Sequence, residues 1–270
     1  MSKHGSARAV LAGAAIAATL ALAGCGGVPK GTKPDVPGEN AGDTGTAAAT
    51  SRLSSTAPLT TRPNTLQGAA AAKSFAKANS IPFPVAVGNT WIYQTQAGGQ
   101  TGRTTNRIVA AGPGSGGYRV TVSSTTDIGG SASTVVPVYT FYPNGTIGFP
   151  VPPVSSVPVT GTAIRWPDAA GLASGKIYHS TLHIPGGDAH VTVQGAGTTS
   201  VSVPAGTYRA SVVKTTITAQ GQNIEVTVWI AQGTGPVKTE VVIRAPGGTG
   251  LTTSDLLSFT KAASVIGDGS

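Results

Sequence analysis

The chain contains one cysteine in 270 residues, Cys25. A thiol is an intrinsically strong nucleophile that can be acylated, oxidised or bound to a metal. A disulfide within these residues and a metal cluster held by several thiolates both need more than one cysteine, so both are excluded. Any stable covalent bond that Cys25 forms to a partner group therefore joins it to another molecule.

The residues before Cys25 indicate which chemistry that is. Lys3, His4 and Arg8 give the chain a positive start, and the run from Ala9 to Ala23 is almost wholly apolar. This layout is typical of a signal peptide. A membrane-spanning helix needs about 20 apolar residues, and this run is shorter. We therefore expect residues 1–24 to be a secretory signal.

The four residues Leu22, Ala23, Gly24 and Cys25 resemble the lipobox of bacterial lipoproteins. In that family the cysteine thiol takes a diacylglyceryl group, the signal peptide is cut before the cysteine, and the new amino group is acylated, typically with palmitate. The resemblance implies a protein held on the extracytoplasmic face of the cell membrane by lipid on Cys25. Each buried methylene contributes about 0.8 kcal/mol, so two or more acyl chains anchor firmly.

Histidines and an aspartate form a second group with chemical potential: His179, His183, His190 and Asp188. Imidazole and carboxylate together suit zinc. On the strand expected here, however, His179 and His183 would lie about 13 Å apart, at about 3.3 Å per residue. Only His183 and His190 could approach each other, across the turn that ends at Asp188. The sequence therefore predicts surface histidines and no functional metal, with His183, His190 and Asp188 as weak candidates.

Motifs of known enzymes give no catalytic residue and no cofactor. Residues 112–117 match the dinucleotide pattern by letter, but a strand follows at Tyr118 where the pattern needs a helix. A serine-hydrolase elbow, a phosphate loop and a zinc-binding helix are missing from the sequence. The formal net charge of +8 is dispersed without Lys or Arg runs, so nucleic acid is not an expected partner. We expect a protein that is not an enzyme.

Two parts of the chain follow Cys25. From Gly26 to about Ser80 it is rich in Gly, Pro, Thr, Ala and Ser and almost free of large apolar residues. Such a segment cannot bury enough surface to offset its ordering entropy. We expect residues 25–80 to form a flexible, disordered linker, with one short helix between Leu66 and Asn79 if it packs on the next domain.

Residues 81–270 predict an all-β domain, because short alternating runs are separated by Gly, Asn, Asp and Pro. In the clearest strand, 223–231, Ile224, Val226, Val228 and Ile230 share one face, which predicts a buried face. Turn residues between neighbouring runs predict an antiparallel meander. The other expected strands are 90–96, 104–110, 118–125, 134–142, 176–184, 189–194, 198–203, 208–218, 237–244 and 251–260.

Two segments of this domain carry a further resemblance. Residues 84–93 read Pro-Val-Ala-Val-Gly-Asn-Thr-Trp-Ile-Tyr, and residues 203–208 read Val-Pro-Ala-Gly-Thr-Tyr. Both look like segments of uncharacterised bacterial lipoprotein β-domains, and the Ala, Gly and Thr bias indicates an actinobacterial source. The resemblance implies a curved antiparallel sheet or half-open barrel, distantly like the half-barrel lipoproteins that hold lipid on the concave side.

These features predict a membrane-anchored cell-envelope lipoprotein with a non-catalytic β-domain that binds a hydrophobic ligand or an envelope component such as a protein. Two alternatives remain open: a purely structural or adhesive surface module, and a hydrolase with an unrecognised site. Alternating strands can enclose a cavity or a filled core, so the ligand-binding residues are unknown at this point. Trp91 and Trp229 are expected in core or rim packing, and Trp166 is the best candidate for an exposed contact.

Overall fold

The structure, a computed structural model, describes residues 84–114, 116–149, 160–161, 164–184 and 187–262. The predicted signal peptide, the lipobox with Cys25, the linker and the short helix between Leu66 and Asn79 lie outside these residues. Within the described ranges, no helix combines the length and the apolar character that crossing a bilayer requires.

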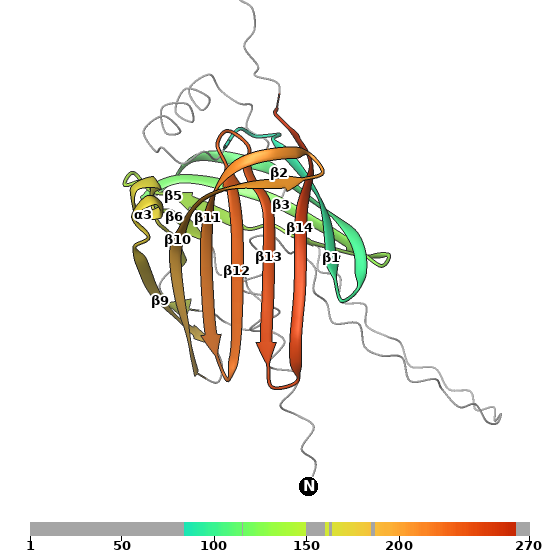
Figure 1. Cartoon of the computed structure of the whole chain (residues 1–270). Coiled ribbons are helices and arrows are strands. Elements are labelled where there is room, and N and C mark those ends of the chain that lie inside the picture. Colours follow the sequence, from blue (N-terminus) through green and yellow to red (C-terminus); the bar gives the residue numbers. More distant parts are fainter. Residues whose placement is uncertain (1–83, 115, 150–159, 162–163, 185–186, 263–270) are drawn as a thin grey trace, which may run out of the picture.

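One antiparallel sheet of 14 strands makes up nearly all of the described chain. In Figure 1 the sheet is strongly curved, with β9 to β14 in front and β2 and β3 passing behind them. The strands are β1 (Thr90–Ala97), β2 (Gln100–Gly114), β3 (Gly117–Ile128), β4 (Ser131–Val135), β5 (Val138–Phe141), β6 (Ile147–Phe149), β7 (Thr160–Gly161), β8 (Ile164–Trp166), β9 (Ile177–Ile184), β10 (Gly187–Val203), β11 (Gly206–Ala219), β12 (Gln222–Ala231), β13 (Gly235–Ala245) and β14 (Gly248–Thr260).

The order of strands across the sheet is mostly the order along the chain. It runs β7-β9-β10-β11-β12-β13-β14-β1-β2-β3-β5-β6-β8, and β4 pairs with β3 beside that path. The last strand, β14, pairs with the first, β1, so that Thr95 lies opposite Ser254. The predicted antiparallel meander is therefore confirmed. The pairing of β14 with β1 also joins the last strand of the domain to the first.

Tight turns explain why neighbouring strands form hairpins. In the turn between β11 and β12, Gln220 and Gly221 both have positive φ, at 48° and 74°. Two successive positive φ values define the turn whose twist matches that of paired strands. Between β5 and β6 the Asn144 side chain accepts a hydrogen bond from the Thr146 amide at 3.1 Å. Both turns stand where the sequence predicts them.

Several elements differ from the expected ones. The runs 189–194 and 198–203 belong to one strand, β10, because pairing with β11 continues on both sides of a bulge between Gly195 and Thr198. The run 134–142 is divided into β4 and β5, which end and begin on either side of Pro137. Proline cannot donate to a ladder. The short strands β6, β7 and β8 were not predicted.

A six-residue helix, α3 (Ala169–Ser174), also differs from the purely β prediction. Asp168 caps its start by accepting a hydrogen bond from the Gly171 amide at 2.8 Å. Gly175 ends it in the left-handed region, at φ 69°. Helix α3 packs on β10 and β11, and β8 lies against β9 and β10. The two ends of the sheet therefore nearly meet, and the predicted curved antiparallel sheet or half-open barrel is confirmed.

The outer halves of β10 and β11 form an arm that bends over one end of the sheet (Figure 1). At its tip the Ala205 amide donates to the Leu256 carbonyl of β14 at 2.9 Å. In the sheet, β11, β12 and β13 separate β10 from β14. The bond between Ala205 and Leu256 therefore requires the arm to cross over the open end of the curved sheet. Gly197, with φ 81°, lies in the bulge at the bend.

The concave face of the sheet holds the core. Ile224, Val226, Val228 and Ile230 are each at most 3% exposed, which confirms the buried face predicted for that strand. Hydroxyls are also buried there, in a chain of hydrogen bonds on the inner sides of β3, β2, β1 and β14. Thr126, Thr104, Thr95 and Ser254 form this chain, with oxygen–oxygen distances of 2.9, 2.8 and 3.0 Å.

Candidate functional site

Two neighbouring cavities lie inside the curved sheet, beside α3 and β8. The first, here called the aromatic cavity, has a volume of about 30 Å³. The second, here called the helix-side cavity, has a volume of about 150 Å³. Ile147 and Trp166 line both, so these two side chains form the wall between them. Each is a place in the described part where a ligand could enter the sheet.

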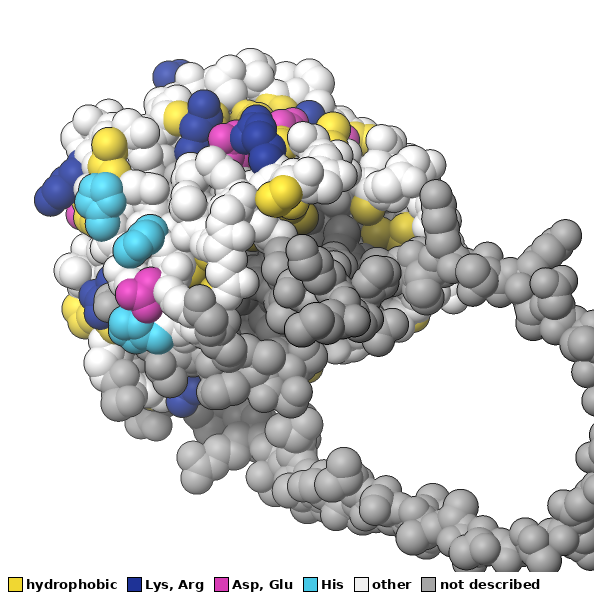
Figure 2. All heavy atoms as spheres, turned by 90° about the horizontal axis from the view of Figure 1, so that it is seen from below, with side chains coloured by type: hydrophobic (Ala, Val, Ile, Leu, Met, Phe, Trp, Pro, Cys, Tyr) yellow, Lys and Arg dark blue, Asp and Glu magenta, His cyan; other side chains and the backbone are white. Residues whose placement is uncertain are grey.

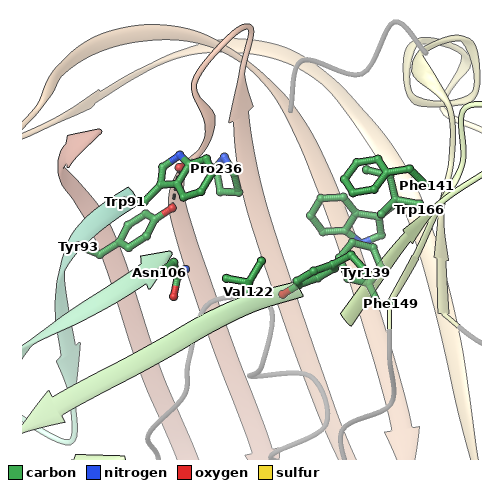
Figure 3. Close-up of a pocket in the computed structure, with 10 residues that line it drawn as sticks. Trp91, Tyr93, Asn106, Val122, Tyr139, Phe141, Phe149, Trp166 and Pro236 are labelled. Atoms are coloured by element: carbon green, nitrogen blue, oxygen red, sulfur yellow. Dashed lines mark hydrogen bonds between the residues drawn. The ribbon is translucent and has the colours of Figure 1, made fainter. Parts of the chain in front are cut away.

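The aromatic cavity lies between two groups of rings that face each other across the fold. Figure 3 shows Trp91, Tyr93 and Pro236 on one side, a second aromatic group on the other, and Asn106 and Val122 between them. That second group is Tyr139, Phe141, Phe149 and Trp166, from β5, β6 and β8. A wall of aromatic rings with few polar atoms is typical of a site for apolar groups.

Alternation along short strands places these rings on the concave face. Tyr139 and Phe141 are two residues apart on β5, so both point to the same side of the sheet. Phe149 packs its ring at 4.5 Å from Trp166 and at 5.4 Å from Tyr139, in tilted and edge-to-face geometry. Such pairs stabilise each other by about 0.5–1.5 kcal/mol beyond area burial. These contacts hold Tyr139, Phe149 and Trp166 together as a unit.

Polar atoms of the first group bond to the turn before β13 and to the first residues of that strand. The Trp91 indole N–H donates to the Thr234 carbonyl at 2.6 Å, and the Tyr93 hydroxyl donates to the Pro236 carbonyl at 3.0 Å. Burial, together with the nearby Tyr139, raises the pKa of Tyr93 well above its ordinary value, while a hydrogen bond with Asn106 opposes that shift. Burial also raises the pKa of Tyr139. Both phenols stay protonated at neutral pH.

Trp166 differs from Trp91 in its hydrogen bonding. Its side chain is buried, with 2% of the residue exposed, so the expectation of an exposed contact residue is wrong. The strand β8 turns Trp166 and Ile164 inward and Arg165 outward, where its guanidinium lies 4.1 Å from the Tyr142 ring. The indole nitrogen Nε1 has no hydrogen-bond partner among the described residues. A buried donor without an acceptor is rare in native proteins.

The helix-side cavity lies between α3, the bulge of β10, and the inner sides of β11 and β12. Its polar side chains carry hydroxyl or amide groups, and its apolar wall includes Trp166, Leu172 and Ile230. The lining residues are Ile147, Trp166, Pro167, Ala169, Leu172, Ala173, Gly197, Thr198, Ser211, Ile230 and Gln232. The site is thus mainly apolar with a few neutral polar groups, which is a common pattern for small-molecule sites.

A close approach of α3 to β10 shapes this cavity. A Cβ placed on Gly195 would collide with the backbone of Leu172, including its carbonyl oxygen. Only glycine therefore lets the helix lie against the strand at this point. Gly195 begins the bulge from which the arm bends away. The same few residues consequently hold the helix, the bulge and the cavity in one arrangement.

The histidines predicted to lie on the surface are on the outer side of the β9–β10 hairpin. Asp188 pairs with His183 and His190 pairs with Thr181 across the two strands. The His183 imidazole Nδ1 lies 2.8 Å from an Asp188 carboxylate oxygen, and both side chains are at least half exposed. Figure 2 shows the histidines gathered with an acidic side chain on one flank. No group of three or more potential ligands is placed to hold a metal ion in the described ranges.

The glycine-rich segment that matched the dinucleotide pattern is part of a hairpin. Gly112 and Gly114 belong to β2 and Gly117 begins β3, so no helix follows the glycines. Neither cavity is lined by a carboxylate, an imidazole or a thiol among the described residues. These are the groups that most often serve as general acid, base or nucleophile. The described lining of both cavities therefore consists of apolar and neutral polar groups.

Sequence reasoning did not find the cavity residues, although some signals were present. Asp168 and Gly175 are cap residues at the two ends of a short run, which is a helix signature. Tyr139 and Phe141 alternate on a strand and predict one aromatic face. What no local signal could supply is that α3, β5, β6 and β8 meet Trp91 and the bulge of β10 in space.

Comparisons with known proteins give a fold likeness without a family. No family of known proteins and no curated protein matches the chain. A solved structure from Bacteroides fragilis, described as an exported protein with YmcC-like fold, is 18% identical, with a TM-score of 0.46 over 67% of this chain and 99% of that chain. A second, from Parabacteroides distasonis, described as a lipoprotein, is 14% identical, with a TM-score of 0.44 over 67% and 98% of the two chains. Neither likeness assigns an activity.

Proposed function

We propose that this protein is a cell-envelope lipoprotein, anchored through lipid on Cys25, whose curved sheet binds a small and mainly apolar group in the helix-side cavity. The observation that carries the binding proposal is the pair of adjoining cavities walled by Trp166 and Ile147. The lipobox carries the anchoring proposal, because its chemistry leaves the β-domain outside the membrane. The linker of residues 25–80 would then give the domain reach from the membrane surface.

The size of the cavities limits the ligand. An apolar cavity of about 150 Å³ in another protein accommodates one benzene-sized ring. The helix-side cavity is of the same size, at about 150 Å³, and the aromatic cavity adds about 30 Å³. A single ring or the end of a short chain fits this space, whereas a whole lipid does not. The proposed ligand is therefore a small molecule, or one end of a larger molecule that projects from the cavity.

Binding without catalysis is the mode that the lining chemistry supports. Thr198, Ser211 and Gln232 provide neutral hydrogen-bonding groups, and the rest of the lining is apolar. Such groups orient a ligand and contribute to specificity. General acid–base chemistry commonly uses a group that titrates near the working pH, and the lining residues described for the cavity hold none. We therefore propose a binding protein that is not an enzyme.

A co-purified ligand tests this proposal. The full chain, produced in a lipid-rich bacterial host, is examined by native mass spectrometry beside two helix variants. Ala169 lines the cavity, so Ala169→Leu fills part of it, whereas Ala170 is exposed on the same helix and does not line it. We expect a stoichiometric adduct on the wild type and on Ala170→Leu and at least a tenfold lower occupancy on Ala169→Leu. A bare mass in all three, or equal adducts in all three, would contradict the cavity as the site.

A further inference from the structure

Basic side chains are dispersed along the sequence, but the fold gathers many of them at one end of the sheet. The strands β9, β11 and β13 begin at this end, β10, β12 and β14 finish there, and the arm crosses it (Figure 1). It is here called the arm end. Six exposed cations stand there: Arg107, Arg119, Arg165, Lys176, Arg209 and Lys261.

The strand register places three of these cations on the β14–β1–β2–β3 side of the arm end. Arg107 on β2 lies opposite Thr90, the first residue of β1. Arg119 is the third residue of β3, next to the turn between β2 and β3. Lys261 directly follows the last residue of β14. All three therefore lie at the rim where these strands begin or end.

The other three cations stand beside α3 and on the arm. The Arg165 guanidinium lies 4.1 Å from the ring of Tyr142, which directly follows β5. Lys176 is placed between the end of α3 and the start of β9. Arg209 lies opposite Ser200 in the part of β10 and β11 that forms the arm. Together with the first three, these residues surround the arm end.

Acidic side chains are distributed differently. Asp168 is at the arm end, where it caps α3 by accepting a hydrogen bond from the Gly171 amide at 2.8 Å. The other acidic residues of the described ranges stand in the middle of the sheet or at its opposite end: Asp127, Asp188, Glu225, Glu240 and Asp255. Figure 2 views that opposite end, where acidic and basic side chains lie next to each other. Within the described ranges, no ion pair joins any of the six arm-end cations to a carboxylate.

Exposed apolar side chains accompany the cations. Val109, two residues after Arg107, is 42% exposed, and Ile177, directly after Lys176, is 48% exposed. Leu257, near the end of β14, is 38% exposed. Binding to the surface of a bilayer combines attraction between cations and anionic lipids with burial of apolar groups among the headgroups. The arm end offers both kinds of group.

The chain also enters the domain at the arm end. Thr90 at the start of β1 pairs with Thr260 at the end of β14, and Figure 1 shows both strand ends on the same side as the arm. Cys25 and Pro84 are separated by 58 residues, which as a flexible coil would span about 40 Å on average. Lipid on Cys25 would therefore keep the arm end within reach of the bilayer.

We propose that the arm end docks on the anionic headgroups of the membrane to which Cys25 is anchored. The headgroup phosphates supply the negative charge that the described residues do not supply to these cations. This contact goes beyond the proposed ligand site, because none of the six cations lines either cavity. Since α3 and the bulge of β10 lie at the same end, docking brings the helix-side cavity to the membrane surface.

Flotation with lipid vesicles tests the docking surface. The mature chain, residues 25–270 with Cys25→Ser, carries no lipid and therefore reports only the contact made by the protein surface. One double variant, Arg107→Gln with Arg209→Gln, removes two charges from the arm end. Its matched control, Lys214→Gln with Arg244→Gln, removes the same charge from the middle of β11 and from the opposite end, where both side chains are also exposed.

We expect the unmodified surface to bind vesicles that contain phosphatidylglycerol and not vesicles of phosphatidylcholine alone. Each Lys or Arg near an anionic surface strengthens binding about fivefold, so the arm-end variant should bind about 25-fold more weakly. The control variant should lose less than about threefold, because its cations stand farther than a Debye length from the headgroups. Raising the salt concentration should release the protein from the vesicles.

Three results would overturn the proposal. Equal weakening by the two double variants would mean that binding follows net charge and not the arm end. Equal binding to both kinds of vesicle, or to neither, would exclude recognition of anionic headgroups. Displacement from the vesicles by soluble poly(glycerol phosphate) at a lower phosphate concentration would assign the surface to an anionic polymer. Ala169→Leu should bind vesicles like the unmodified surface, so failure of the cavity as a ligand site is distinguishable from failure of docking.

Discussion

Replacing Thr104 by valine tests the buried chain of hydroxyls on the concave face. Thr104 is 0% exposed, and its hydroxyl bonds to those of Thr95 at 2.8 Å and Thr126 at 2.9 Å. Valine keeps the branched shape and the preference for strands but removes the hydroxyl. The substitution therefore breaks two hydrogen bonds in the middle of the chain and leaves Thr126 without the partner that the structure gives it.

The expected cost follows from the number of bonds lost. Each net hydrogen bond contributes about 1 kcal/mol, so Thr104→Val should lower the free energy of unfolding by about 2 kcal/mol. Thr126→Val loses one of the same bonds and should cost about 1 kcal/mol. The double variant loses only the two bonds that Thr104→Val already loses. It should therefore cost about 2 kcal/mol, which corresponds to a coupling of about 1 kcal/mol between the two sites.

Urea unfolding of the full chain at pH 7, followed by circular dichroism, measures these values. The matched control is Thr125→Val, because Thr125 stands next to Thr126 and shares its hydrogen bond with Thr134 on the exposed side of the sheet. A surface change of this kind should alter the free energy by less than about 0.5 kcal/mol. In a thermal scan, Thr104→Val should lower Tm by about 4–8 °C.

Equal destabilisation by Thr104→Val and Thr125→Val would refute the reasoning, because only the first removes bonds that water cannot replace. Simple additivity of Thr104→Val and Thr126→Val would refute the claim that the two hydroxyls bond to each other. The first result would mean that solvent reaches the inner face of β1 to β3.

Three other predictions concern other parts of the chain. Burial, and secondarily Tyr139, raises the pKa of Tyr93 above its ordinary 10.0, so the contribution of the protonated phenol to stability is present below pH 10 and declines above it. Tyr93→Phe should make the fall in unfolding free energy between pH 10 and 11 shallower by up to about 1.4 kcal/mol per pH unit. Urea unfolding at a series of pH values measures this slope, and an unchanged slope would contradict the prediction. Gly195→Ala should lower Tm and displace α3, because the added carbon meets Leu172. Gly112→Ala should do neither, because its added carbon meets open space. Thermal scans and the protection of α3 amides from hydrogen exchange distinguish the two variants. Cys25→Ala should abolish labelling with radioactive palmitate and leave the protein uncleaved or soluble, and normal lipidation of that variant would exclude Cys25 as the anchor.

Local sequence patterns predicted the parts of the fold whose cause is local. The alternation of Ile224, Val226, Val228 and Ile230 reports the period of a strand directly, and all four side chains are buried. The turn at Gln220 and Gly221 needs two residues that accept positive φ, which the sequence shows by residue type. Because each of these features depends on a few neighbouring residues, the curved antiparallel sheet could be expected without coordinates.

The histidines show where local reasoning stops. The expectation of a strand was enough to predict that His179 and His183 lie far apart. The partner of His183, however, depends on the register between β9 and β10. That register places Asp188 opposite His183 and moves His190 to Thr181. A shift of one residue would change every pair across the hairpin. The contact between His183 and Asp188 therefore follows from the strand register and not from the amino-acid composition.

The sequence by itself determined the all-β class, most of the strands and the resemblance of residues 22–25, with the single Cys25, to a lipobox, because each depends on residue types at short spacing. Only the tertiary structure decided that Trp166 is buried, that α3 lies on Gly195, and that two cavities share the wall between them. The physical reason is that alternation fixes the side of a sheet to which a residue points, whereas burial depends on which distant segment covers that side. The candidate site is made by such coverage, from residues separated by up to 145 positions between Trp91 and Pro236.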